Sequence, residues 1–385
     1  MDIIEENPWE NIGHLEFVSS MKIGWNLGNS FDAHNNMNPG ETAWGNPLTT
    51  RELINAVAAQ GFGAVRIPVT WGNMIGNAPN YTINSAWLDR VAEVVEYVRA
   101  AEMRAIINIH HDGADSRYWL SVKTADLSGD SKAAIDAKFT AVWRQIANYF
   151  KDTGNFLLFE GFNELHDGSW SDGSAAQRNR VNELNQIFVN TVRASGGENA
   201  NRYLVIHGWV TRPSVTVSSL VMPDDSAQNR IIVGIHFYDP YAFTGDATQT
   251  TWGQGHTTQN NWANESHVRN TFDSVKNRFI DNGIPVIIGE YGAVRQSGEA
   301  GKKYRKYYME YVTKYAADCG LIPFYWDNGS SRAGSEGFGL FNRSSPYGLL
   351  SDAADIIAVM MGAVVPGTHA IYSVPSGTGT LDRKW

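Results

Sequence analysis

Short apolar runs alternate with longer amphipathic stretches along nearly the whole chain. Eight of the runs are rich in Val, Ile, Leu and Phe, which is typical of strands that are buried on both faces. The predicted strands are Lys22–Leu27, Ala64–Val69, Ala105–Ile109, Phe156–Phe159, Tyr203–Ile206, Ile231–Phe237, Pro285–Gly289 and Ile322–Trp326.

Amphipathic segments between these runs predict helices. Two of the segments end at Gly283 and Gly320, as is common for glycines at helix C-termini. The segment Thr211–Asp225 is poorly periodic, so we expect its crossover helix to be weak or replaced by a loop. The predicted helices are Thr50–Gln60, Ala86–Glu102, Lys132–Lys151, Ala176–Ser195, Asn264–Asn282, Gly298–Cys319 and Ala353–Met361.

Eight strands that alternate with helices predict a (β/α)₈ TIM barrel of the α/β class. The alternative is a pair of doubly wound domains, but no G-x-G-x-x-G motif follows a strand and no Pro- or Ser-rich linker divides the chain. We therefore expect a single catalytic domain over residues 1–385, with its core at about 20–362 and a C-terminal extension at 363–385.

Composition narrows the function classes. The net charge of −9 disfavours a nucleic-acid partner, and no apolar run of about 18 residues predicts a membrane span. A single cysteine, Cys319, excludes an internal disulfide and a cysteine-based zinc site. The 13 tryptophans suit either a large core or a surface that stacks on sugar rings. The acidic N-terminus resembles no signal peptide, so the protein is either intracellular or lacks a leader in this chain.

Polar side chains gather where the predicted strands end. In a barrel of parallel strands these ends meet at one face, which is where active sites lie. The residues at or near these ends are Asn26, Asn29, Arg66, His110, His111, Asp112, Asn163, Glu164, His207, Trp209, His236, Tyr238, Glu290, Trp326, Asp327 and Asn328.

Two glutamates, Glu164 and Glu290, follow the apolar runs of the fourth and seventh predicted strands. Glycoside hydrolysis needs two carboxylates facing one cleft, one as proton donor and one as nucleophile or base. Their pKa values must differ, and the guanidinium of Arg66 could keep one carboxylate ionised. The alternative is that each glutamate pairs with a helix cap or a lysine in a purely structural role.

Several of these residues together resemble the pattern of glycoside hydrolase family 5, the cellulase family of the retaining (β/α)₈ clan. The segments Ile23–Asp32 and Glu41–Gly45 look like the opening of its branch of bacterial and rumen-type endo-β-1,4-glucanases. The resemblance covers roughly residues 20–350 and implies a β-1,4-glucan substrate and no cofactor. The matching residues are Asn163-Glu164, Glu290 after Val286–Gly289, His236-Phe237-Tyr238, Arg66 and Trp326.

The resemblance also implies roles for the catalytic residues. Glu164 resembles the general acid/base and Glu290 the nucleophile of a double displacement that retains the anomeric configuration. The negative charge of Glu290 is then expected to raise the pKa of Glu164. Arg66 and Tyr238 would hydrogen-bond Glu290, and Asn163 would bind the sugar 2-OH.

The same resemblance implies a surrounding shell. His110 and His236 would line the site and hold the network around the acid/base, while Trp326 would form the floor at the cleavage subsite. His111 and Asn29 look like further contacts on the glycone side. Position in or near the loops adds four candidates for flanking subsites, although local packing is an equal alternative for each tryptophan. These four are Trp44, Trp209, Trp252 and Asn328.

Glu160 lies four residues before Glu164, so both point to the same side of the strand. We expect Glu160 to face the barrel interior, where a buried carboxylate needs a partner. Arg66 or a neighbouring histidine is the natural candidate. A structural role is therefore favoured over direct catalysis.

Other functions stay open at this point. A β-mannanase or xylanase of the same clan shares the pattern, and a non-catalytic sugar-binding protein would also carry aromatic platforms. A metal-dependent barrel hydrolase would use His110, His236 and a glutamate, but it lacks the expected His-x-His on the first strand. We expect a neutral β-glucan as partner, no metal, nucleic acid or membrane, a monomer, and secretion because the implied substrate is an extracellular polymer.

Overall fold

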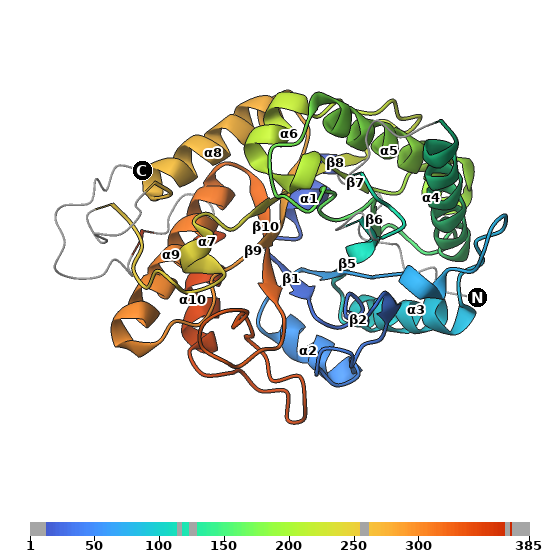
Figure 1. Cartoon of the computed structure of the whole chain (residues 1–385). Helices are drawn as coiled ribbons and strands as arrows, with labels where there is room; N and C mark the ends of the chain where they lie inside the picture. The colour runs from blue at the N-terminus through green and yellow to red at the C-terminus, as the bar shows by residue number, and fades with distance from the viewer. Residues whose placement is uncertain (1–12, 114–117, 123–128, 255–261, 366–369, 372–385) are drawn as a thin grey trace.

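The computed structural model describes residues 13–113, 118–122, 129–254, 262–365 and 370–371, and its centre is a closed barrel of parallel strands (Figure 1). The order around the barrel is β1-β10-β9-β8-β7-β6-β5-β4, with β4 paired back to β1. This confirms the predicted TIM barrel. The strands are β1 Gly24–Leu27, β4 Ala64–Ile67, β5 Arg104–Asn108, β6 Leu157–Glu160, β7 Leu204–His207, β8 Ile231–Phe237, β9 Val286–Tyr291 and β10 Leu321–Asp327.

Helices surround the barrel (Figure 1). The segment predicted to be weak contains only the short helix α6, Pro213–Ser219, which begins with a proline at its first turn. Gly283 and Gly320 have φ of 77° and 78°, the left-handed conformation expected of them. The remaining outer helices are α2 Arg51–Ala59, α3 Ser85–Ala100, α4 Gly129–Tyr149, α5 Ala175–Ala194, α7 Tyr241–Thr244, α8 Glu265–Arg278, α9 Gly298–Asp318 and α10 Ala353–Ala363.

The ends of the chain are only partly described. Helix α10 ends at Ala363, and most of the predicted extension 363–385, namely 366–369 and 372–385, lies outside the described residues. Among the described residues, no helix has the length and apolar character needed to cross a membrane.

The N-terminal end of the barrel is closed by α1, His14–Ser19, a helix that the apolar pattern did not predict. Its Phe17 stacks on Tyr203 with ring centroids 4.0 Å apart, and the Arg104 guanidinium lies 4.6 Å from the centroid of the same ring. Alternate residues of every strand point into the barrel, and those nearest α1 are apolar. Its buried members include Ala64, Ile106, Leu158, Val205, Ile232, Ile287 and Phe324.

The C-terminal ends of the strands carry the loops and several short elements. A two-stranded hairpin, β2 His34–Asn35 and β3 Asn38–Pro39, follows β1, and single 3₁₀ turns follow β5 and β7 at His111–Gly113 and Trp209–Thr211. Arg66, His236 and Glu290 lie within β4, β8 and β9, so the rigid barrel itself positions polar residues at this face and the loops surround them.

Candidate active site

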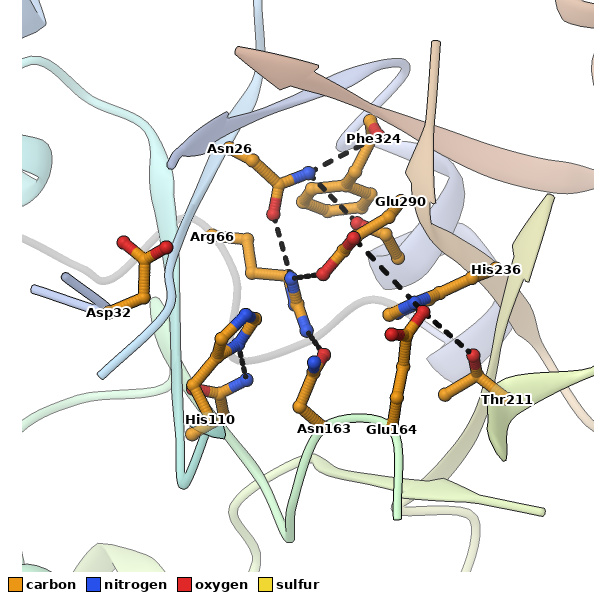
Figure 2. A network of polar contacts seen from close by, with 12 residues as sticks. Asn26, Asp32, Arg66, His110, Asn163, Glu164, Thr211, His236, Glu290 and Phe324 are labelled. Carbon is orange, nitrogen blue, oxygen red and sulfur yellow. Dashed lines mark hydrogen bonds and ion pairs between the residues drawn. The ribbon is translucent and has the colours of Figure 1, made fainter. Parts of the chain in front are cut away.

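Arg66 on β4 is the centre of the polar network (Figure 2). Its Nη1 donates to Glu290 Oε1 at 2.8 Å and to Asn26 Oδ1 at 2.9 Å. Its Nη2 donates to Asn163 Oδ1 at 2.7 Å, while Nε and Nη2 bind both oxygens of Glu160 at 2.7 Å each. One guanidinium thus fixes four side chains from three other strands or strand ends, a use that the planar fork of arginine suits well.

Glu160 lies below this centre, fully buried in the barrel interior. Besides Arg66, it accepts a hydrogen bond from Asn108 Nδ2 at 2.9 Å, and His207 Nε2 lies 3.2 Å from its Oε1. Gly234 leaves room for the His207 ring, because a Cβ there would lie 2.2 Å from that ring. Although burial alone would raise it, the pKa of Glu160 lies well below its usual range, because the charge and hydrogen bonds of Arg66 outweigh burial.

Glu164 follows β6 and has a different environment. Its side chain is 19% exposed, and His236 Nδ1 lies 2.6 Å from its Oε1. Burial raises the pKa of Glu164 to about 7, opposed by nearby His166 and Arg66. The rise was expected from the charge of Glu290, but its largest cause is the cost of burying the charged form.

Glu290 on β9 faces Glu164 across the same cleft. Its Oε1 accepts from Arg66, its Oε2 accepts from the Tyr238 hydroxyl at 3.2 Å, and His236 Nδ1 lies 3.7 Å from Oε2. Burial raises the pKa of Glu290, while His236 and Arg66 oppose the rise. One carboxylate oxygen of Glu290 and one of Glu164 lie within 4.8 Å of each other. The two groups are therefore close enough to act on the two sides of a single bond.

His110, His111, His236 and Tyr238 act as neutral groups near neutral pH. Burial lowers the pKa of His236 and His111 to about 3 and that of His110 well below its usual value. Burial also raises the pKa of Tyr238 well above 10, so its hydroxyl keeps its proton and remains a donor to Glu290. The main charges at the centre are then Arg66 and the glutamates.

A cavity of about 320 Å³ opens beside this centre, between the loops that follow β1 and β10. Asn29, Trp44 and Asn328 line it, together with Arg332. Trp44 is 42% exposed and its ring lies 5.5 Å from that of His111. Four predicted binding residues are therefore grouped on one side of the site, and their contacts with a ligand stay predictions. They are Asn29, Trp44, His111 and Asn328.

Known proteins resemble this chain over nearly its whole length. A profile of the family described as "Cellulase (glycosyl hydrolase family 5)" matches residues 27–332. Endoglucanase A of Paenibacillus barcinonensis is 38% identical over 347 residues, which are 85% of this chain and 85% of that protein. The chain belongs to glycosyl hydrolase family 5.

Solved structures agree with this assignment. A "GH5-4 broad specificity endoglucanase" from Bacteroides salanitronis has a TM-score of 0.89 and 45% identity, covering 92% of this chain and 96% of that one. A "Family 5 xyloglucanase" from Paenibacillus pabuli has a TM-score of 0.83 and 40% identity, covering 90% and 99%. The resemblance to family 5 and the predicted barrel are both confirmed.

In this family 5 protein the predicted support residues lie around the two glutamates. Arg66 and Tyr238 both hydrogen-bond Glu290, as expected. Trp326, 8% exposed, lies nearly parallel to the His110 ring with centroids 6.0 Å apart. Gly28 allows this approach, because a Cβ there would lie 2.8 Å from the Trp326 ring. Trp326 thus lies at the edge of the site, and its role as a sugar platform stays a prediction.

Two predicted binding residues, Trp209 and Trp252, are packing residues instead. Each is only 1% exposed. Trp252 packs on Tyr308 and donates to the Ala263 carbonyl at 2.7 Å, while Trp209 donates to the Ser171 carbonyl at 2.8 Å. A buried ring cannot stack on a sugar, so this prediction was wrong for both. A position near a loop did not reveal that the rings turn inward.

Several polar residues that build the site had no predicted role. Asn26 Nδ2 donates to the Gly289 carbonyl at 2.9 Å while its Oδ1 holds Arg66. Asn108 connects Glu160 to His110, whose Nδ1 lies 3.1 Å away. The available signal was an amide side chain inside or at the end of an otherwise apolar strand, where an unpaired amide would be costly.

Two sets of side chains among the described residues are close enough to hold a metal ion, and neither is the set that the metal-dependent alternative needed. That alternative joins His110, His236 and a glutamate. In the set that contains Glu290, the Arg66 guanidinium already occupies one carboxylate oxygen, which disfavours a second cation. The sets are Asp32, His110 and His111, and Glu164, His236 and Glu290.

Proposed function

We propose that this family 5 protein is a retaining endo-β-1,4-glucanase that acts by double displacement. The observation that carries the proposal is the spacing of Glu164 and Glu290, whose nearest carboxylate oxygens lie within 4.8 Å. Retaining glycosidases place their carboxyl groups about 5–5.5 Å apart, whereas inverting enzymes need about 6.5–9.5 Å to admit a water.

The different environments of the two glutamates divide the roles. Glu164, whose pKa is raised to about 7, carries a proton at mildly acidic pH and serves as the acid. Glu290 is positioned by hydrogen bonds from Arg66 and Tyr238, and the Arg66 charge opposes the rise of its pKa that burial causes, so it serves as the nucleophile.

In the first step, a Glu290 oxygen attacks the anomeric carbon while the glycosidic bond breaks and the Glu164 proton moves to the leaving oxygen. In the second step, Glu164 takes a proton from water as the water attacks the same carbon and releases Glu290. Because the ester removes the charge of Glu290, Glu164 becomes an easier group to ionise and can change from acid to base.

The substrate class follows from the relatives and the cleft. Several relatives are named endoglucanases, and one of them, from Bacteroides ovatus, is a "Xyloglucan-specific endo-beta-1,4-glucanase BoGH5A" that is 37% identical over 367 residues. We propose cellulose derivatives and mixed-linkage glucan as substrates, with xyloglucan accepted. Because these polymers lie outside cells, we also propose that the enzyme acts outside the cell. We propose further that it acts as a monomer.

A panel of polysaccharides tests this function. Carboxymethylcellulose, barley β-glucan and xyloglucan are incubated with the wild type and with Glu290→Ala, beside galactomannan and arabinoxylan. We expect viscosity to fall before reducing ends accumulate on the glucans, with no change for the variant. Activity confined to mannan or xylan, or release of short products only from chain ends, would contradict the proposal.

A further inference from the structure

The loop between β6 and α5 presents a tryptophan, Trp170, on the surface beside the acid/base. Its side chain is 53% exposed, and its backbone has a φ of 55°, in the left-handed region that disfavours large side chains. More than half of the indole surface is therefore open to solvent, in a backbone conformation that is unfavourable for a large side chain.

The rest of the loop holds Trp170 in this conformation. Arg212 Nη2 donates to the Trp170 carbonyl at 2.6 Å, and Arg212 Nη1 also binds Asp172. The next residue, Ser171, accepts a hydrogen bond from the buried Trp209 ring at 2.8 Å. Gly173 fits against the same ring, since a Cβ there would lie 2.6 Å from it. The loop is therefore docked on the barrel and presents the indole in a fixed position.

One face of the Trp170 ring is covered by His166, which follows Glu164 by two residues. The two rings stack with centroids 4.3 Å apart and an angle of 25°. His166 is 5% exposed and close enough to Glu164 for its charge to act on that carboxyl group. The His166 ring thus lies between Trp170 and the surroundings of Glu164.

The barrel order shows on which side of the scissile bond Trp170 lies. In the closed order β1-β10-β9-β8-β7-β6-β5-β4, strand β6 is diametrically opposite β10. The cavity lined by Trp44 and Asn328 belongs to the loops after β1 and β10, whereas Trp170 follows β6, so the two flank the catalytic pair from opposite sides. Glu164, also from β6, protonates the leaving oxygen in the proposed mechanism, which places the leaving sugar on the Trp170 side.

We propose that Trp170 forms the platform of the leaving-group subsite, where its indole stacks on the apolar face of the departing pyranose ring. This inference rests on the proposed glucanase function. A rigid, exposed indole suits a neutral sugar, because it covers C–H groups and leaves the hydroxyls to water and polar side chains. The platform contributes only when the leaving group is a sugar.

The test compares two substrates that share the proposed mechanism. The leaving group from cellohexaose is an oligosaccharide. The leaving group from β-cellotriosyl fluoride is a fluoride ion, which has no ring to stack. The variants are Trp170→Asn, which tolerates the left-handed backbone, and Trp170→Phe, which keeps a ring. Trp262→Ala is the matched control, because Trp262 is also 53% exposed but packs edge-to-face with His267 of α8.

We expect Trp170→Asn to lower kcat/KM for cellohexaose about tenfold. Its kcat/KM for β-cellotriosyl fluoride should stay within about twofold of wild type, and its Tm should be unchanged. Trp170→Phe should retain most of the activity, and Trp262→Ala should match the wild type. Equal losses on both substrates, or no loss on cellohexaose, would overturn the proposal, and a lowered Tm with equal losses would show a packing role. A wild type inactive on both substrates would overturn the glucanase function itself, and the platform with it.

Discussion

The two ends of the barrel interior are lined by the same eight strands but have opposite chemistry. The N-terminal end is filled by apolar side chains and sealed by Phe17 of α1, stacked on Tyr203. The C-terminal end is filled by charged and amide groups that surround Arg66. The first end gains its stability from burial of apolar surface, whereas the second depends on every polar group having a partner.

Glu160 and Glu164 show the same contrast four residues apart, one at the last residue of β6 and the other in the loop that follows. Glu160 accepts hydrogen bonds from Nε and Nη2 of Arg66 and has a pKa well below its usual range. Glu164 lies in the loop after β6, where it contacts the neutral His236, and its pKa is raised to about 7. Distance from a single guanidinium thus separates a structural carboxylate from a proton donor.

The largest expected effect is at the nucleophile. Glu290→Ala should lower kcat on a β-glucan on the order of 10⁴-fold or more, because the glycosyl ester cannot form. Added azide or formate, small enough to enter the vacated space, should restore part of the activity. Initial rates on mixed-linkage glucan, with Tm measured by calorimetry, check this prediction. Normal activity in this variant would remove Glu290 from the mechanism.

The next effect concerns the proton donor and its pH dependence. The acid must carry a proton, so kcat/KM of the wild type should fall as pH rises through about 7, the raised pKa of Glu164. Glu164→Gln should lower kcat on glucans by about 10²–10⁴-fold and abolish this basic limb. The limb is measured in pH profiles of both proteins. Its persistence in Glu164→Gln would assign it to another group.

The third effect sharpens the difference between Glu160 and Glu164. Glu160→Gln leaves the buried Arg66 charge without its main partner, and should lower the free energy of unfolding by about 3–5 kcal/mol. Glu164→Gln should change stability far less, because its partner His236 is neutral. Urea denaturation of the two variants makes the comparison. If Glu160→Gln abolished turnover without loss of stability, its structural role would be wrong.

The smallest effect is at the apolar end. Phe17→Ala removes the ring that stacks on Tyr203, and should lower the free energy of unfolding by about 3 kcal/mol. Because this end lies opposite the polar rim, kcat/KM at 25 °C should stay within about twofold of wild type. A large loss of kcat/KM in the folded variant would show that the two ends are coupled.

The fold was predictable because strands buried on both faces leave an unambiguous apolar pattern. All eight barrel strands overlap the predicted runs, and the poorly periodic segment holds only the short α6. Helix α1 was missed because a single turn and a half carries no clear period. The hairpin of β2 and β3 was missed because strands of two residues have no alternation to detect.

The site was predictable as far as it depends on strand ends. Because strand ends converge on one rim, Arg66, Glu164 and Glu290 were predicted to lie together, and the structure places them in one network. Ring orientation in loops was not predictable. Trp209 and Trp252 turn inward, whereas Trp170 is held outward by an arginine 42 residues further along the chain.

The most direct test of the catalytic pair is the configuration of the first product. Proton NMR follows the anomeric signals during the first minutes of hydrolysis of a β-1,4-glucan oligosaccharide, before mutarotation. Double displacement by Glu290 and Glu164 predicts that the β-anomer appears first and decays toward equilibrium. Initial appearance of the α-anomer would mean a single displacement by water, and would contradict the account of the site.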